Sequence, residues 1–191
     1  MIIGITGGTG CGKSTLLQEL EKLGAVVVDC DAVYYQLLKT DVALLSAIEK
    51  RFPDMVEGGV LQRKKLGAIV FADESALADL NRITHGAIRA EVLRRIAGAE
   101  LAAIDAIGLF ESGLAALCDV TVAVTAPTEE RIRRLMMREG ITGDYARSRI
   151  GAQPDNSWFA QRCDYTLENA GTPADFQSKC LAFFRQTGII K

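Results

Sequence analysis

The chain opens on a short apolar segment, residues 2–6, that runs directly into the sequence Gly7-Gly8-Thr9-Gly10-Cys11-Gly12-Lys13-Ser14. These eight residues fit the phosphate-binding pattern G-x-x-x-x-G-K-[ST], and a helical pattern follows them, as that motif requires. Glycines let the backbone turn tightly and aim its N–H groups at an anion, and the positive end of the following helix adds to the same site. The alternative is a glycine-rich turn that binds nothing. The motif in this setting favours binding of a nucleoside triphosphate.

The residue types of this loop predict how it holds a nucleoside triphosphate and Mg²⁺. The Lys13 ammonium can reach the β- and γ-phosphates, and the Ser14 hydroxyl can ligate Mg²⁺. For Cys11 two interpretations stay open: a thiol whose pKa is lowered by the electropositive loop and which oxidises, or a small residue that packs. The residues expected to bind the nucleoside triphosphate here are Gly8, Gly10, Cys11, Gly12, Lys13, Ser14 and Thr15.

Composition limits the remaining possibilities. A length of 191 residues with 49% hydrophobic residues suits one well-packed domain with small insertions. A net charge of −2 gives no reason to expect a nucleic-acid partner. No apolar run approaches the ~20 residues of a membrane span, no signal-peptide pattern opens the chain, and the five cysteines form no C-x-x-C pair. We therefore expect a cytoplasmic protein with reduced thiols, a monomer or small homo-oligomer, that binds neither nucleic acid nor membranes.

Apolar runs alternate with amphipathic segments along the chain. Strand patterns occupy residues 2–6, 25–29, 101–107, 120–125 and 165–167, and a last helix begins with Thr172 as cap and Pro173 at its first position. Near-continuous apolar strands separated by helices predict a parallel sheet covered on both faces. The predicted fold is therefore α/β, a three-layer sandwich of the P-loop NTPase type with a parallel five-stranded sheet.

Two regions interrupt this alternation. No strand is evident between residues 31 and 98, where helical patterns lie at 31–39, 41–52, 62–71 and 75–97, and this stretch exceeds a normal crossover. Three further helical segments follow one another at about 129–163. We predict a helical acceptor-binding sub-domain over 31–98 and a helical lid over 129–163. The core then consists of residues 1–30, 99–128 and 164–191.

Two carboxylates close the second predicted strand at the edge where the phosphate loop begins. Ligands of open parallel sheets bind at this carboxyl edge, so Asp29 or Asp31 is expected to face the γ-phosphate. Transfer to an alcohol requires a carboxylate that accepts or orients the hydroxyl proton. Asp31 fits that role, whereas Asp29 can hold Mg²⁺ through water. The alternative for Asp31 is to cap a helix that begins at Ala32, and the two roles are compatible.

Two other acids and the histidine have open roles. Asp105 ends the third predicted strand, so a metal contact and a surface turn are both possible for it, and Glu111 follows six residues later. His85 is the only histidine of the sequence. On composition alone it is more typical of a hydrogen-bonded structural residue than of a catalyst.

Arginines gather in the second helical region. Arg131, Arg134 and Arg138 recur at i, i+3 and i+7 and so share one helix face. Guanidinium groups can clamp triphosphate oxygens and offset charge in the transition state. The alternative is solvated pairing of helix arginines with the glutamates at positions 129 and 130. We expect such pairing for the helix as a whole, and phosphate contact for Arg138, which lies nearest the following helices.

Further motifs run in order through nearly the whole chain. They are Thr6–Ser14, Val28-Asp29-Cys30-Asp31, Leu61-Gln62-Arg63, His85, Leu109-Phe110-Glu111, Arg134-x-x-x-Arg138, Gln153, Asp164-Tyr165 and Asn169-x-Gly171. In these residues and their spacings the chain resembles the dephospho-CoA kinase family. The resemblance implies transfer of the ATP γ-phosphate to the ribose 3′-hydroxyl of dephospho-CoA, the last step of coenzyme A synthesis. It thereby implies ATP and dephospho-CoA as small-molecule substrates and Mg²⁺ as cofactor.

The resemblance also implies roles for individual residues. Asp31 is the catalytic base, acting with Lys13 and with Arg138 as a phosphate ligand of the lid. The acceptor region contains Asp31, His85, Arg89 and Glu111. The resemblance therefore implies that His85 binds the acceptor, whereas composition alone suggested a structural residue. Asn169 and Gly171 belong to the loop that binds the adenine of ATP.

The chain departs from the family pattern on the acceptor side. The family usually has alanine where this chain has Cys30, arginine at Tyr35, proline at Gly86, Pro-Leu at Ile107-Gly108, and a lid lysine near Phe159. The missing basic residues at 35 and 159 remove two potential contacts to phosphate or acceptor. The alternatives to the implied reaction are a related kinase acting on another nucleotide-like alcohol and, in a different class, a nucleotide-binding switch protein.

Overall fold

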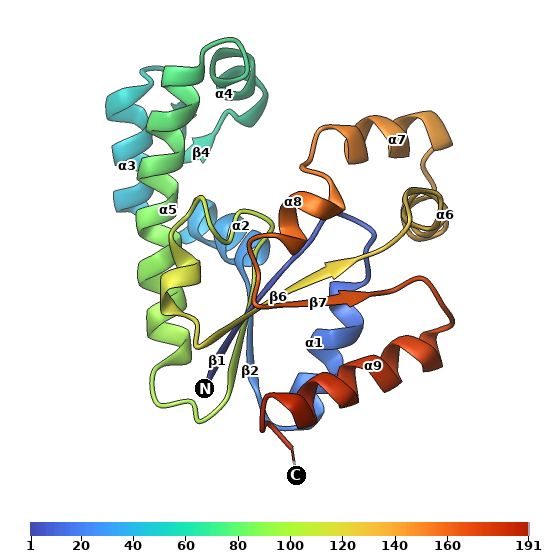
Figure 1. The fold of residues 1–191 in the computed structure, drawn as a ribbon. Coiled ribbons are helices and arrows are strands. Elements are labelled where there is room, and N and C mark those ends of the chain that lie inside the picture. The colour runs from blue at the N-terminus through green and yellow to red at the C-terminus, as the bar shows by residue number, and fades with distance from the viewer. Residues whose placement is uncertain (191) are drawn as a thin grey trace. The chain divides into compact units, whose positions relative to one another are not determined.

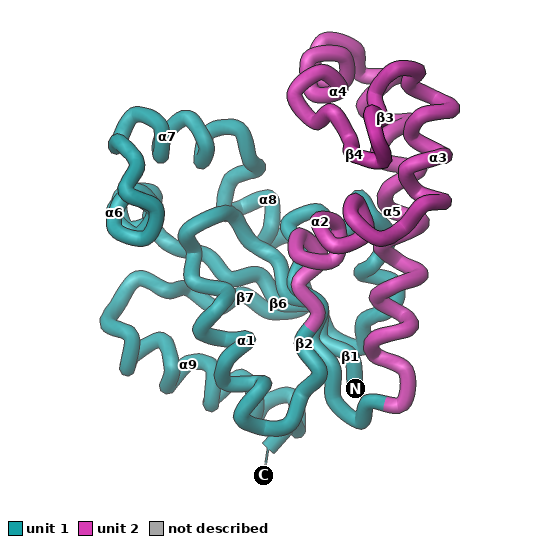
Figure 2. The backbone as a smooth tube through the Cα atoms, turned by 180° about the vertical axis from the view of Figure 1, so that it is seen from behind, with its two compact units in different colours: residues 1–27, 99–191 teal, residues 28–98 magenta. Residues whose placement is uncertain are grey.

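The computed structural model describes residues 1–190 (Figure 1). The chain forms two compact units (Figure 2). The first consists of residues 1–27 together with the chain from residue 99 onward, and the second consists of residues 28–98. No helix among the described residues is long and apolar enough to cross a membrane.

Most of a five-stranded sheet lies in the first unit. Its strands are β1 (Ile2–Thr6), β5 (Ala102–Asp105), β6 (Val120–Thr125), β7 (Tyr165–Glu168) and β2 (Val26–Asp29), in the order β2-β5-β1-β6-β7. The central strand β1 pairs in parallel with β5 and β6, and β6 pairs in parallel with β7. The predicted α/β fold with a parallel five-stranded sheet is confirmed. The second predicted strand lies at the edge of the sheet, where Val28 is buried, Val27 is partly buried and Val26 is exposed.

Two helices cover one face of the sheet. Helices α1 (Lys13–Lys22) and α9 (Pro173–Gln186) lie side by side in Figure 1. The central core contains Ile3 and Ile5 of β1, leucines of α1, and three phenylalanines of α9. As predicted, α9 begins with Thr172 as cap and Pro173 as its first residue. Asp175 completes a reciprocal capping box with Thr172.

The opposite face of β1 is covered by residues 106–118, which include the 3₁₀ helix η1 (Leu114–Leu117). The approach is close: a Cβ on Gly4 would lie 2.7 Å from Cys118 Sγ and 2.9 Å from Leu109 Cδ2. The Thr6 hydroxyl also donates a hydrogen bond to the Ile107 carbonyl, at 3.0 Å. Helices and loops therefore enclose the central strands from both sides.

Three helices follow β6, as the sequence predicts. They are α6 (Thr128–Glu139), α7 (Gly143–Gly151) and α8 (Asn156–Ala160), and a separate apolar cluster joins α6 to α7. Phe159 of α8 is only 1% exposed and stacks edge-on against Trp158. Phe159 therefore anchors α8 in the core.

The second unit is mainly helical. Its helices are α2 (Cys30–Thr40), α3 (Val42–Arg51), α4 (Arg63–Val70) and α5 (Glu74–Ile96), at the positions where the sequence predicts helices, and they share a core of their own. The expectation that this region has no strand is wrong. A hairpin of β3 (Val56–Glu57) and β4 (Val60–Leu61) turns at Gly58 and Gly59, whose φ angles of 57° and 79° suit a two-residue hairpin turn.

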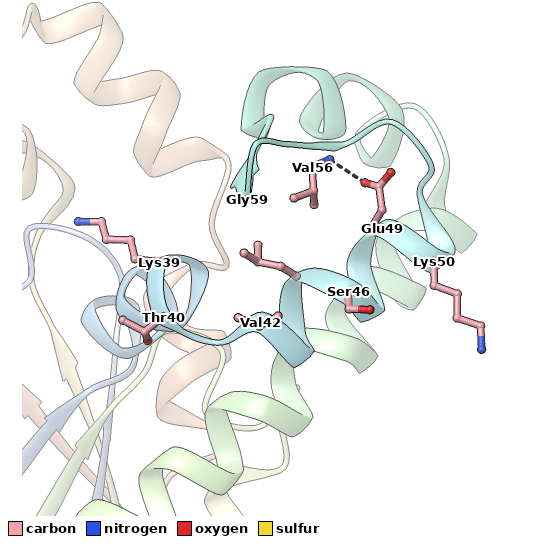
Figure 3. A pocket seen from close by; sticks show the side chains of 9 residues that line it. Lys39, Thr40, Val42, Ser46, Glu49, Lys50, Val56 and Gly59 are labelled. Carbon is pink, nitrogen blue, oxygen red and sulfur yellow. Dashed lines mark hydrogen bonds between the residues drawn. The ribbon is translucent and has the colours of Figure 1, made fainter.

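A cavity of about 560 Å³ opens in this helical unit, between the end of α2, helix α3 and the hairpin (Figure 3). Glu49 of α3 fixes the hairpin beside it, because its carboxylate accepts hydrogen bonds from the N–H groups of Asp54, Met55 and Val56. Val42, Leu45 and Val56 contribute apolar side chains to the cavity lining, and Thr40, Ser46 and Glu49 contribute polar ones.

Candidate active site

The glycines of the phosphate loop are required by both conformation and space. Gly7, Gly10 and Gly12 have φ angles of 137°, 78° and 97°, a region that other residues rarely adopt. A Cβ on Gly7 would lie 2.1 Å from the Val124 carbonyl oxygen, and one on Gly12 would lie 2.2 Å from Asn169 Nδ2. The loop therefore packs against the end of β6 and against Asn169, and no larger residue fits at these two positions.

The start of α1 is suited to bind an anion. Gly12 occupies the N-cap position, and no side chain of the described residues forms a capping hydrogen bond there. The first turn contains no acidic residue, and Ser14 within it is exposed. The N–H groups of a first helical turn have no partner inside the helix, and they carry the positive end of its dipole. This arrangement provides the hydrogen-bond donors that a phosphate requires.

Lys13 is held at the loop by two groups. Its Nζ donates a 3.0 Å hydrogen bond to the Gly7 carbonyl and lies 3.8 Å from Asp105 Oδ1. Both side chains are mostly buried, with exposed fractions of 12% for Lys13 and 17% for Asp105. The surface-turn interpretation of Asp105 is therefore wrong, because the residue ends β5 beside the phosphate loop. Its ion pair directs the lysine toward that loop.

The side chains of Arg131 and Gln153 form hydrogen bonds with the backbone of Thr9 in the phosphate loop. Arg131 of α6 is 2% exposed, and its Nε donates a 2.9 Å hydrogen bond to the Thr9 carbonyl. The Gln153 amide oxygen accepts from the Thr9 N–H at 2.8 Å and from Arg131 Nη2 at 3.3 Å. The three residues form a closed network that fixes the peptide groups on both sides of Thr9.

Arg134 and Asn169 hold the next two carbonyls of the loop. Arg134 Nη1 donates to the carbonyls of Gly10 and Cys11 at 3.4 and 3.3 Å, and Asn169 Nδ2 donates to the Cys11 carbonyl at 3.0 Å. Arg134 Nη2 also donates to the Asn169 backbone and side-chain oxygens, at 3.1 and 3.2 Å. Asn169 is thus a buried structural support of the phosphate loop.

The expected solvated pairing of the arginine helix is wrong for its inner face. Arg131 and Arg134 contact the phosphate loop, while Glu130 pairs with Arg133 and Glu129 pairs with Arg147. In the sequence, the i, i+3 spacing of Arg131 and Arg134 indicates that the two arginines share a helix face. Their burial against loop carbonyls was not predictable, because it depends on contacts far along the chain.

The remaining arginine of the predicted row lies near the end of α6. Arg138 pairs with Glu139, and its side chain is 61% exposed. Its guanidinium therefore faces solvent, in contrast to Arg131. The phosphate contact assigned to Arg138 stays a prediction.

Cys11 has the environment of a packed residue. Its side chain is fully buried, and this burial raises the pKa of the thiol, outweighing the positive charges of Lys13 and Arg131 that lower it. The thiolate is the reactive form of cysteine. The interpretation of Cys11 as an activated thiol is therefore wrong, and its packing role is confirmed.

The aspartate that caps α2 is not the one that the sequence suggested. The helix starts at Cys30, and Asp29 Oδ1 accepts hydrogen bonds from the N–H groups of Asp31 and Ala32, at 2.9 and 3.0 Å. The cap is therefore Asp29, and the expectation that Asp31 caps a helix starting at Ala32 is wrong. Asp31 lies exposed in the first turn, where the cap fixes its backbone.

The other predicted acceptor and adenine residues lie on several elements. His85 and Arg89 are one turn apart on α5 and share a helix face. Glu111 is exposed in the segment between β5 and η1. Gly171 precedes α9, and a Cβ there would lie 2.8 Å from Asp175 Oδ2 of the capping box.

The phosphate loop connects the central parallel strand to a helix without a side-chain cap, and arginines of α6 bind its carbonyls. This arrangement defines a nucleotide-binding protein of the P-loop class. The family model "Dephospho-CoA kinase" matches residues 1–175. The chain therefore belongs to the dephospho-CoA kinase family.

Individual relatives agree with this assignment. The dephospho-CoA kinase of Anaeromyxobacter dehalogenans is 41% identical over 185 residues, which cover 93% of this chain and 88% of the relative. That of Corynebacterium diphtheriae is 38% identical over 178 residues, covering 90% and 89%. Among solved structures, TT1252 from Thermus thermophilus superimposes with a TM-score of 0.81 at 32% identity, covering 97% of each chain.

The capping role of Asp29 makes a prediction about stability. Replacement Asp29→Ala removes the acceptor for two N–H groups and is expected to lower the free energy of unfolding by about 1 kcal/mol. Asp29→Asn keeps an oxygen in the same place and is expected to stay within a few tenths of a kcal/mol of the parent. Urea denaturation of the three proteins measures both values. Equal stability of the alanine and asparagine variants would contradict the capping role.

Proposed function

We propose that this chain transfers the γ-phosphate of ATP to the 3′-hydroxyl of the ribose of dephospho-CoA, which gives coenzyme A. The observation that carries the proposal is the phosphate loop, whose carbonyls accept hydrogen bonds from Arg131, Arg134 and Asn169, while no side chain of the described residues caps the start of α1. Membership of the dephospho-CoA kinase family supports the identity of the acceptor.

On the donor side, the phosphates of ATP are bound by Gly8, Gly10, Cys11, Gly12, Lys13, Ser14 and Thr15. Lys13, now held by Gly7 and Asp105, binds the β- and γ-phosphate oxygens and stabilises the charge that develops during transfer. Arg138 adds a second cation from α6. Asn169 and Gly171 bind the adenine, in addition to the support that Asn169 gives the loop.

The residues at the start of α1 fit Mg²⁺. Ser14 presents an exposed hydroxyl in the first turn, next to the N–H groups expected to hold phosphate. Within residues 1–190 no cluster of three or more His, Cys, Asp or Glu side chains is placed to hold a metal. Mg²⁺ needs no such cluster, because it keeps several waters and is bound through substrate phosphates and one or two protein oxygens. When bound, the ion supplies charge neutralisation at the phosphate oxygens.

On the acceptor side, Asp31 accepts the proton of the 3′-hydroxyl as that oxygen attacks the γ-phosphorus, and ADP leaves with the bridging oxygen of the broken bond between the β- and γ-phosphates. The Asp29 cap supports this role because it fixes the backbone that carries Asp31. His85 and Arg89, one turn apart on α5, bind the acceptor together with Glu111.

The chemistry of the chain also suits a cytoplasmic enzyme of small molecules. All five cysteines are free thiols in the structure, which is the form kept in a reducing compartment. A net charge of −2 gives no electrostatic reason to expect nucleic acid as a partner.

A coupled kinase assay over a panel of acceptors tests the proposed reaction. With ATP and Mg²⁺, dephospho-CoA is expected to give the highest kcat/KM among dephospho-CoA, adenosine, 5′-AMP, shikimate and gluconate. A higher kcat/KM for another alcohol would show that the enzyme is a kinase with a different acceptor. Tight ATP binding without phosphorylation of any acceptor would favour the switch protein instead.

The assigned roles of Asp31 and Lys13 predict different kinetic effects. Asp31→Asn is expected to lower kcat by about 10²-fold or more while ATP affinity stays unchanged, because it removes the proton acceptor only. Lys13→Ala is expected to lose both ATP binding and turnover, because it removes a phosphate ligand. Calorimetric titration with ATP and initial rates separate these outcomes. An unchanged kcat for Asp31→Asn would exclude Asp31 from the mechanism.

A further inference from the structure

Tyr35 of α2 holds the side chain of Arg63, the first residue of α4. The Arg63 guanidinium carbon lies 4.7 Å from the centroid of the Tyr35 ring, and Arg63 Nη2 donates a 3.2 Å hydrogen bond to the Tyr35 hydroxyl. The two contacts combine a cation–π interaction with a directional hydrogen bond. Tyr35 thereby fixes both the position and the orientation of the guanidinium plane.

Arg63 differs from most other arginines of the helical unit in having no acidic partner. Arg51 and Arg82 pair with Asp79, and Arg94 and Arg95 pair with Glu91. Among residues 1–190, no carboxylate oxygen lies within 4.0 Å of the Arg63 guanidinium, and the side chain is exposed. A guanidinium held on an aromatic ring, with its charge not neutralised, is suited to bind phosphate oxygens through two parallel hydrogen bonds.

The position of this pair relative to Asp31 indicates which anion it meets. Tyr35 follows Asp31 by four residues, so the two side chains share a face of α2, about 6 Å apart along the helix axis. In dephospho-CoA the diphosphate is attached to the 5′ carbon of the ribose whose 3′-hydroxyl is to be phosphorylated. A cation one helical turn from the proposed base therefore suits this diphosphate.

The same ridge of α2 continues toward the cavity of the helical unit. Lys39 follows Tyr35 by four residues and lines that cavity with the apolar side chains of Val42 and Leu45 (Figure 3). Beyond its diphosphate, dephospho-CoA carries an uncharged chain of methyl groups, methylenes and amides. The order of base, cation and apolar cavity along α2 matches the order of hydroxyl, diphosphate and uncharged chain in the acceptor.

We propose that Arg63 binds the diphosphate of the acceptor and that Tyr35 is the positioning residue that holds Arg63 for this contact. The proposal rests on the proposed function. It also gives a physical role to Tyr35, which stands where the family usually has arginine. In this chain Tyr35 does not provide a positive charge itself but positions Arg63, which α4 provides.

Steady-state kinetics on the full chain, with saturating ATP and varied dephospho-CoA, test this assignment. Arg63→Gln is expected to raise KM for dephospho-CoA about 10- to 100-fold, the loss of one or two charge-assisted contacts, with KM for ATP and kcat within about twofold of the parent. Tyr35→Leu is expected to reproduce most of this increase. Tyr35→Phe, which keeps the ring, is expected to restore most of the affinity. Arg94→Gln, an exposed arginine paired with Glu91, serves as the control and is expected to change nothing.

The double variant Tyr35→Leu/Arg63→Gln separates positioning from an independent contact. If Tyr35 acts through Arg63, the double variant has the KM of Arg63→Gln alone, whereas multiplied effects would overturn the positioning role. An unchanged KM for dephospho-CoA in Arg63→Gln would overturn the proposal, as would an equal rise in KM for ATP. Should Arg63→Gln not fold, Arg63→Lys keeps the charge without the planar fork, and the expected KM is then intermediate. A parent enzyme that does not turn over dephospho-CoA would contradict the proposed function itself.

Discussion

The hydrogen bonds that bind the carbonyl oxygens of the phosphate loop are the interactions on which the site depends. Arg131 and Arg134 of α6 and Asn169 after β7 bind three successive carbonyls, those of Thr9, Gly10 and Cys11. A glycine-rich segment has many accessible conformations, and ordering it costs conformational entropy. Because Arg131, Arg134 and Asn169 already order the loop in the folded protein, part of this entropy is lost during folding. Less of the cost then has to come from the binding energy of ATP.

This bracing couples the phosphate loop to the helices that follow β6. Arg131 is buried under the loop, and its neighbours Ile132 and Leu135 pack α6 against α7. Gln153, which lies between α7 and α8, binds the Thr9 N–H. A change in the position of α6 or of the segment at Gln153 therefore changes the loop carbonyls or amides directly. The region predicted as a lid is thus also a structural part of the donor site.

Local patterns in the sequence predict much of the fold and the donor loop. Apolar strands, helix periodicity and the Thr172 cap act over a few residues, so they are visible in sequence alone. The β3–β4 hairpin was missed because two-residue strands are too short to show alternation, although Gly58-Gly59 was an available signal. The burial of Arg131 was missed because its partner, Thr9, lies 122 residues away. The Tyr35–Arg63 contact likewise joins two helices through residues 28 positions apart.

Hydrogen exchange of the Thr9 backbone amide, followed in the protein without nucleotide, tests most directly whether the chain's own contacts shape the phosphate loop. The account predicts that this amide exchanges at least about tenfold more slowly than in an unstructured peptide, because it is hydrogen-bonded to Gln153. Gln153→Ala should remove the protection. Exchange at the rate of an unstructured peptide until ATP is added would contradict the account, since the loop would then be ordered by its ligand.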